Sequence, residues 1–155
     1  SQKNNTPMLI YRLNYAVDFR YGVMVELAKS VLSGKAIDLR TENVNVIWQG
    51  DANEIAIRSL LHCEAPAKML NVTGPETLST RWIAEQFGVI FKKEPNFINE
   101  SAGTALLNNA STCHRLFGYP KVTVREIIEL TATWMQEGGE ALNKPTHFQE
   151  RSGKF

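Results

Sequence analysis

The stretch 44–61 constrains the fold of this chain more than any other. Residues 44–48 form an apolar, extended run that breaks at Gly50. Asp51 and Glu54 follow with the spacing of a capping box, an acceptor for the free N–H groups of a helix start and an acid three residues on. Small and apolar residues then recur at helical spacing, at Ala52, Ile55, Ala56, Ser59, Leu60 and Cys63. The stretch predicts a buried strand, a tight turn and a helix with one packed face.

The rest of the chain alternates in the same way. Helices are predicted over 21–33, from Thr77 or Ser79 to Gly88, over 110–117, and from Thr123 to Gly138, each stopped by a glycine. Strands are predicted over 8–13, 36–39, 68–73, 89–91 and 97–98, with a polar turn at 40–43. Because strands alternate with helices, the sequence predicts an α/β fold of short strands and helices with some parallel pairing.

Composition excludes several classes of partner. The 155 residues include 17 Lys and Arg against 16 Asp and Glu, which gives no basic footprint for nucleic acid. No apolar run approaches the roughly 20 residues that span a bilayer. The two cysteines, Cys63 and Cys113, match no zinc spacing and are expected to be reduced, intracellular thiols. We therefore expect a cytoplasmic protein with no nucleic-acid partner, no membrane partner and no metal.

Catalytic motifs are missing from the sequence. It contains no glycine-rich dinucleotide loop, no P-loop and no nucleophile elbow. A tyrosine followed four residues later by lysine, the pair that depresses a tyrosine pKa for proton transfer, does not occur. We therefore predict no catalytic residue and no cofactor-binding residue in this chain.

Five short segments in order resemble a known family. They are Tyr11-Arg12-Leu13-Asn14, Ser33-Gly34-Lys35-Ala36-Ile37, the run from Val44 to Asp51, Leu70-Asn71-Val72-Thr73-Gly74 with Leu78-Ser79, and the run from Arg115 to Val122 with Trp134. Together they resemble the C-terminal, substrate-binding half of an extended short-chain dehydrogenase/reductase of the NAD-dependent epimerase/dehydratase family. The resemblance implies the C-terminal part of a Rossmann-type fold, whose dinucleotide-binding half would lie upstream of Ser1.

The resemblance also implies a set of substrate contacts. Asn14 stands where the family places an asparagine that holds the substrate diphosphate. Val44 stands where the family has a phosphate-binding arginine, and Arg20 or Arg40 is a candidate to replace that charge. Arg12 lies in a strand predicted to be buried, so it needs a partner that is either structural or a ligand. The predicted substrate-binding residues are Asn14, Arg20 and Arg12.

Two regions are expected in the chain. Residues 1–139 form the substrate-binding region, and residues 140–155 form a C-terminal tail that docks on the protein. The tail holds two phenylalanines, a histidine and a proline, which is unusual for a disordered end. It either packs on its own domain or a neighbour, or brings His147 and Arg151 near the substrate.

The first functional hypothesis is the substrate-binding region of an NAD(P)-dependent epimerase/dehydratase-like oxidoreductase. Its small-molecule substrate would be a sugar or nucleotide-sugar-like compound, and this chain would be inactive alone. NAD or NADP would bind in the full-length protein. The alternative is a non-catalytic, dinucleotide-binding relative that serves as a sensor or partner-binding module, and a third reading is a self-contained α/β domain. For a fragment we expect a homo-oligomer, because strand edges and an apolar face would be left uncovered.

Overall fold

The computed structural model describes residues 1–144 and 146–148. Its α-helices are α1 (Val23–Ser33), α2 (Gln49–Ser59), α3 (Thr80–Phe91), α4 (Ser111–Phe117) and α5 (Val124–Gln136). Its strands are β1 (Leu9–Leu13), β2 (Ala16–Val17), β3 (Ile37–Asp38), β4 (Thr41–Val44), β5 (Ile47–Trp48), β6 (Lys68–Val72), β7 (Leu78–Ser79), β8 (Phe97–Ile98) and β9 (Thr104–Leu106). Single 3₁₀ turns occupy Gln2–Asn4 and Leu60–His62. The predicted α/β mixture of short strands and helices is confirmed.

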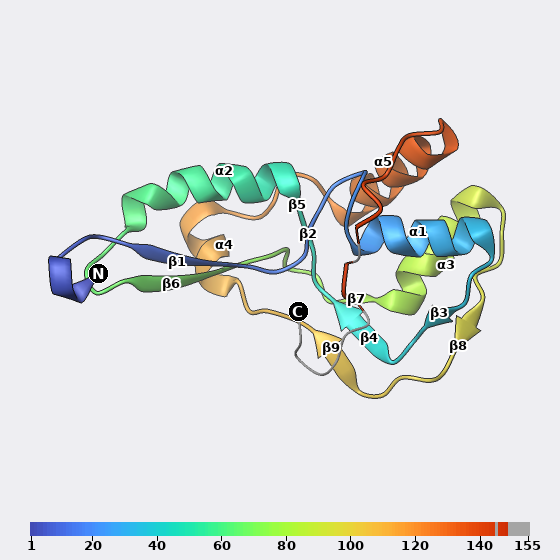
Figure 1. Cartoon of the computed structure of the whole chain (residues 1–155), viewed down its shortest axis with the longest axis horizontal. Coiled ribbons are helices and arrows are strands. Elements are labelled where there is room, and N and C mark those ends of the chain that lie inside the picture. The colour runs from blue at the N-terminus through green and yellow to red at the C-terminus, as the bar shows by residue number, and fades with distance from the viewer. Residues whose placement is uncertain (145, 149–155) are drawn as a thin grey trace.

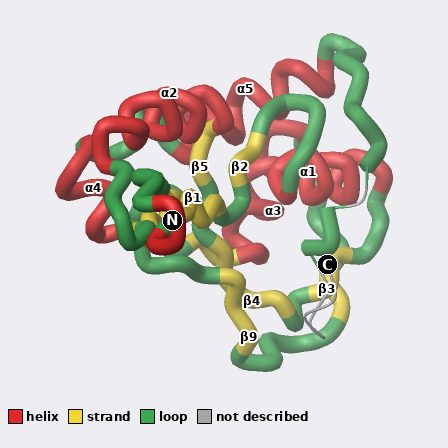
Figure 2. The backbone as a smooth tube through the Cα atoms, turned by 60° about the vertical axis from the view of Figure 1, so that its left-hand side comes forward, coloured by secondary structure: helices red, strands yellow, loops and turns green. Residues whose placement is uncertain are grey.

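The strands form small sheets at two ends of an elongated molecule. At one end β1 pairs in parallel with β6, and α2 and α4 lie along this pair (Figure 1). At the other end lie α1, α3 and α5, with β4 between antiparallel β7 and parallel β9. The parallel pairs β2–β5 and β3–β8 complete the set. Figure 2 brings the first end forward and again shows α2 and α4 near β1.

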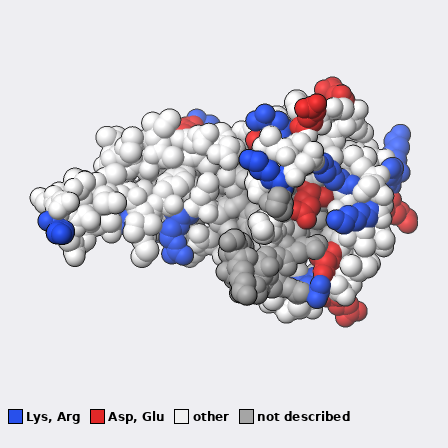
Figure 3. All heavy atoms as spheres, in the orientation of Figure 1, with Lys and Arg blue, Asp and Glu red and all other residues white. Residues whose placement is uncertain are grey.

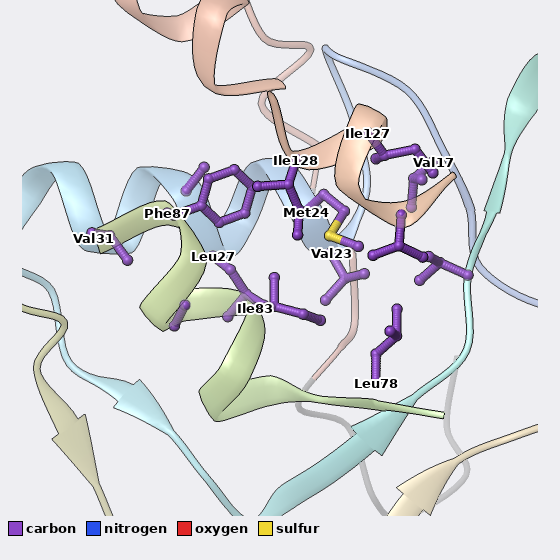
Figure 4. Packing of buried hydrophobic residues seen from close by; sticks show 14 of the residues in the cluster. Val17, Val23, Met24, Leu27, Val31, Leu78, Ile83, Phe87, Ile127 and Ile128 are labelled. Carbon is purple, nitrogen blue, oxygen red and sulfur yellow. The ribbon is translucent and has the colours of Figure 1, made fainter. Parts of the chain in front are cut away.

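Two hydrophobic cores correspond to these two ends. The helical core lies between α1, α3 and α5, where Met24, Leu27, Phe87 and Ile128 are at most 3% exposed and point toward one another (Figure 4). The sheet core lies between the β1–β6 pair and its two helices, and includes Ile55, Leu70, Val72 and Cys113. Each amphipathic helix therefore buries its apolar stripe, which is the main source of helix stability in a protein.

The other face of the β1–β6 pair is uncovered. Side chains alternate between the two faces of a strand, and Ile10 and Met69, which are partners in the register, are 47% and 66% exposed. The prediction that 8–13 forms a buried strand is therefore wrong in its burial, although the strand itself is present. Arg12 is also exposed, so its expected need for a buried partner does not arise. We call the surface formed by Met8, Ile10, Arg12 and Met69 the bare face.

The stretch 44–61 differs from its prediction in two ways. Residues 44–48 are divided between β4, which ends at Val44, and β5, which begins at Ile47 and pairs with a different strand. The helix begins at Gln49 with Trp48 at its N-cap, so Asp51 is not the cap. Asp51 instead accepts a hydrogen bond from the backbone N of Val122 at 3.0 Å, which ties α2 to the segment before α5. A tertiary contact, rather than a local cap, accounts for this buried acid.

Two further local predictions are wrong. The helix predicted to stop at Gly88 continues to Phe91, so 89–91 is not a strand; the reversal falls at Lys92, which has a φ of 54°. Gly88 is needed for close approach instead, because an added Cβ would lie 2.7 Å from the carbonyl O of Lys93. Residues 40–43, predicted as a polar turn, supply most of β4, whose pairing with β7 and β9 cannot be read from local polarity.

The predicted helix-end signals at other positions are confirmed. Thr123 and Glu126 form a full capping box at the start of α5. The Ser79 hydroxyl accepts from the backbone N of Trp82 at the start of α3. Gly34 ends α1 with a φ of 70°, a conformation that a residue without Cβ adopts at low cost. These signals depend on neighbours in sequence, which explains why they can be read without the fold.

A pH dependence arises at the end of β3. The Arg40 Nε donates to Asp38 Oδ2 at 2.8 Å, and this side-chain bonding holds the pKa of the buried Asp38 carboxyl well below its usual range. Because the folded pKa lies below the unfolded value of about 4, the stabilisation is fully present above about pH 4 and is lost progressively as the pH falls below that value toward the folded pKa. We expect Arg40→Gln to reduce this loss, measured as urea midpoints between about pH 3 and pH 7. Arg125→Gln, on the exposed side of α5, is the control; equal pH profiles for Arg40→Gln and the wild type would contradict the assignment.

Candidate functional site

Asn14 follows β1 and joins three segments. Its backbone N donates to the Val72 carbonyl at 3.0 Å. Its side-chain Nδ2 donates to Asn45 Oδ1 at 2.7 Å, with the carbonyls of Asn45 and Leu106 at 3.3 and 3.4 Å. The side-chain amide nitrogen is thus already engaged with the β4–β5 link and β9. Its predicted contact with a substrate stays a prediction, and its evident structural role is to hold these strand ends together.

Arg20 lines a cleft of about 650 Å³ beside α1. Four cationic side chains line it, namely Arg20, Lys29, Lys35 and Lys144, and Glu26 is the one acidic residue among the lining residues that the structure describes. Figure 3 shows basic side chains over α1 with acidic ones among them. We call this hollow the basic cleft. Its excess of positive charge favours a ligand that carries a phosphate or carboxylate group.

The second wall of the basic cleft is the C-terminal strap, residues 142–144 and 146–148. The backbone N of Leu142 donates to the Arg20 carbonyl at 2.9 Å, and Lys29 Nζ donates to Asn143 Oδ1 at 2.6 Å. The Thr146 hydroxyl donates to the Glu26 carboxylate. These contacts hold the strap along α1 over its described length.

Phe148 anchors the end of this strap. Its side chain is 1% exposed and belongs to the helical core, where its ring meets Tyr15 edge-on at 6.4 Å. His147 lines the basic cleft, whereas Arg151 lies outside the described residues. The tail thus reaches the cleft through Lys144 and His147.

The three predicted substrate-binding residues do not converge on one site. Arg20 lines the basic cleft, but Asn14 and Arg12 are not among its lining residues. Arg12 lies on the bare face, and Arg40 is paired with Asp38 rather than available to a ligand. Sequence reasoning did not single out Lys29, Lys35 or Lys144 as ligand contacts. The sequence places Lys29 within a predicted helix. It does not reveal that the C-terminal tail folds beside that helix.

Tyr11 and Tyr15 are held in their neutral form. Burial, with a smaller effect of Glu26 and then Tyr21, raises the pKa of Tyr15 to about 12. Burial and then Cys113 raise the pKa of Tyr11 to about 12, and its hydroxyl donates to the Ala52 carbonyl at 2.7 Å. A proton-transfer tyrosine needs a pKa nearer to neutral pH. Neither tyrosine is therefore suited to proton transfer; Tyr15 packs against the helical core and Tyr11 against the sheet core.

Neither cysteine is disulfide-bonded or placed in a metal-binding cluster within the described residues. Cys63 and Cys113 are free thiols, and burial raises the pKa of the Cys113 thiol. Within residues 1–144 and 146–148, no group of three or more His, Cys, Asp or Glu side chains is placed to hold a metal ion. Among those same residues, no helix combines the length and apolarity required to cross a membrane.

Comparison with solved structures shows which known folds this chain is similar to. No protein-family model matches the chain, and no curated protein matches its sequence. The chain is similar to an epimerase from Methanothermobacter thermautotrophicus, with 15% identity, a TM-score of 0.68, and coverage of 87% of this chain and 45% of that one. It is similar to the UDP-glucose 4-epimerase of Thermus thermophilus in complex with NAD, with 20% identity, a TM-score of 0.66, and coverage of 87% and 48%.

A third similar structure is the UDP-N-acetylglucosamine 4-epimerase of Bacillus cereus. Its identity is 16% and its TM-score 0.64, with coverage of 88% of this chain and 49% of that one. At these identities the likeness establishes the fold, which is the Rossmann-type epimerase fold. The chain spans about half the length of each of these three proteins.

Proposed function

We propose that this chain is the substrate-binding, C-terminal half of an NAD(P)-dependent epimerase/dehydratase-like oxidoreductase that acts on a sugar or nucleotide-sugar-like substrate. One observation carries the proposal. The structural match covers nearly all of this chain, but it covers less than half of each epimerase chain. On this proposal the chain has no turnover by itself.

The bare face supports a missing second half. Sheets of parallel strands are normally covered on both faces, and a two-stranded sheet is marginal in isolation. Here α2 and α4 cover one face of the β1–β6 pair, while Ile10 and Met69 on the other remain exposed. A dinucleotide-binding half that extends this sheet and covers the bare face would complete the arrangement.

The residues of this chain indicate which half would bind the cofactor and which would bind the substrate. This sequence contains no glycine-rich phosphate loop, so its residues do not fit the dinucleotide, and the NAD or NADP would be held by the other half. The cofactor would supply the hydride acceptor, and a tyrosine of that half the acid–base group. The basic cleft of this chain would bind and orient the anionic part of the substrate.

A binding experiment tests the role of the basic cleft. UDP-glucose, titrated calorimetrically into the chain, should bind, and inorganic phosphate should compete. Arg20→Ala should weaken binding by about tenfold or more, because hydrogen bonds to charged groups are worth roughly 1.5–3 kcal/mol. Arg125→Ala removes the same charge from the exposed side of α5 and is the control. Equal losses in the two variants, or no binding, would contradict the assignment of the cleft.

A turnover assay tests the fragment proposal separately. The chain mixed with NAD and UDP-glucose should show no epimerisation, and joining it to a dinucleotide-binding half should be required for activity. Turnover by the chain alone would refute the proposed division. The expected homo-oligomer and cytoplasmic location remain predictions, to be checked by sedimentation and fractionation.

The alternative, a non-catalytic dinucleotide-binding sensor or partner-binding module, is favoured by one observation. Val44, at the position of the family's phosphate-binding arginine, is fully buried in the helical core. A complete protein that binds dinucleotide but turns over no sugar substrate would support this alternative over the enzyme.

A further inference from the structure

A second cavity, of about 530 Å³, lies at the carboxyl end of β6. Its lining residues come from the β4–β5 link, the loop after β6, and the segment from the end of β9 through α4 to Tyr119. It shares no lining residue with the basic cleft. We call it the amide pocket, after Asn45, Asn108 and Asn109 in its wall. The carboxyl ends of strands in α/β proteins are where ligands commonly bind.

One asparagine fixes the shape of this pocket. Asn45 Nδ2 donates to the Asn108 carbonyl at 2.9 Å, and Asn45 Oδ1 accepts from the backbone N of Asn108 at 3.2 Å and from Asn14 Nδ2 at 2.7 Å. On the opposite side Asn71 Nδ2 donates to the Asn109 carbonyl at 3.0 Å. The wall is therefore held by hydrogen bonds that do not depend on a ligand.

Other polar groups of the pocket remain available. In the described part of the chain, the side-chain amide of Asn108 and the hydroxyls of Thr77 and Ser111 have no hydrogen-bond partner in the protein. Asn109 Oδ1 accepts from the backbone N of Ser111 at 2.9 Å, which leaves Nδ2 free to donate. The pocket thus presents donors and acceptors together.

Two buried atoms behind this wall also lack partners. They are Asn71 Oδ1 and Thr73 Oγ1, and both are inaccessible to solvent. Buried polar atoms are usually hydrogen-bonded, so unpaired ones call for an explanation. Asn71 contacts Asn109, and Thr73 contacts His114, so both belong to residues that support the pocket wall. Both atoms are inaccessible from the pocket itself, so the proposal for this pocket depends on the accessible groups of its lining.

The histidine of the pocket has a defined tautomer. His114 Nε2 lies 3.0 Å from the Thr73 carbonyl, which can only accept, so Nε2 carries the hydrogen. In the neutral ring Nδ1 is then an acceptor. The His114 ring also contacts Tyr119, with centroids 5.0 Å apart, and Tyr119 is 72% exposed. The two rings give the pocket an aromatic side beside its polar one.

The residues that line the amide pocket favour one chemical class of ligand. No Lys, Arg, Asp or Glu is among the described residues that line the pocket, so nothing there compensates a charged ligand. A hydroxyl both donates and accepts, which suits a wall where amides, hydroxyls and an imidazole nitrogen are mixed. A flat aromatic side suits the apolar C–H face of a ring. We propose that the amide pocket binds a neutral, polyhydroxylated ring, such as one monosaccharide unit, at a site separate from the basic cleft.

The test is an NMR titration of the ¹⁵N-labelled chain with methyl α-D-glucopyranoside. We expect saturable shifts at the amide pocket and a dissociation constant in the millimolar range. Glucuronate and glucosamine, charged pyranoses of similar size, should bind more weakly. Asn108→Ala should weaken glucoside binding by about fivefold, the effect of one lost hydrogen bond. Asn96→Ala, an exposed asparagine with no described side-chain hydrogen bond, should leave it unchanged.

The variants separate this proposal from the basic cleft. Arg20→Ala should leave glucoside binding intact, and Asn108→Ala should leave UDP-glucose affinity at the cleft intact. Preserved backbone spectra will show that each variant is folded. The proposal is overturned if shifts do not saturate, if they map to the basic cleft, if Asn108→Ala has no effect, or if glucuronate or glucosamine binds equally well.

Discussion

Replacing Phe148 with alanine should lower the free energy of unfolding by about 3–5 kcal/mol, the usual cost of removing a buried aromatic side chain. Phe148 is 1% exposed and lies in the helical core against Tyr15, and its carbonyl accepts from the Thr41 hydroxyl at 3.4 Å. The cavity left by alanine would lie in the helical core, where Phe148 packs with residues from α1, α3 and α5. Chemical denaturation at neutral pH measures the change.

Two variants calibrate this prediction. Phe148→Leu keeps most of the volume and should cost clearly less than alanine. Leu61→Ala removes a side chain that is 90% exposed and should change stability by less than about 0.5 kcal/mol. A loss for Phe148→Ala no greater than that of Leu61→Ala would show that the strap is not anchored in solution.

The same substitution connects stability to binding. The strap supplies Asn143, Lys144 and His147 to the basic cleft, and Phe148 fixes its end. A folded Phe148→Ala protein should therefore bind UDP-glucose more weakly than the wild type, although Phe148 carries no charge. Weaker binding by this variant would show that the strap must be held in place by Phe148 for the basic cleft to bind its ligand.

Features set by local sequence could be predicted, and those set by distant partners could not. The capping box at Thr123 and the glycine end of α1 depend on residues within one turn. The end of α3 was misplaced because Gly88 serves a contact with Lys93 and Pro95 rather than a helix stop. Likewise Asp51 had the sequence of a cap, but its partner is the backbone of Val122, 71 residues away.

The candidate site shows the same limit. Arg20 was identified because it follows the first strand, and it does line a cleft. Lys144 was not, because a lysine in a polar tail gives no sign that it will lie beside α1. Arg12 was misjudged because an apolar strand in an α/β sequence is normally covered on both faces, and here one face is bare. The amide pocket depends on asparagines from separate segments of the chain, which no sequence spacing reveals.

Val44→Arg should destabilise this chain strongly, with a loss of more than about 4 kcal/mol. Val44 is fully buried in β4, which lies between β7 and β9, and its register partners are Leu78 and Leu106. A guanidinium placed there would be taken out of water among apolar side chains with no acid in those register positions. Thermal and urea unfolding should both show the loss, whereas Val44→Ile should change stability by about 1–3 kcal/mol at most.

This substitution decides how far the likeness to epimerases extends. If Val44→Arg folds normally and binds UDP-glucose more tightly, the position faces a ligand and the family's phosphate contact can be restored by one residue. If it unfolds the protein, the backbone around β4 is packed as a core, and a phosphate must be bound elsewhere. The basic cleft, with Arg20 and three lysines, is then the candidate place for that phosphate. If Val44→Arg folds and restores the contact, Arg20→Ala should no longer weaken UDP-glucose binding in that background, whereas it should still do so with Val44 in place.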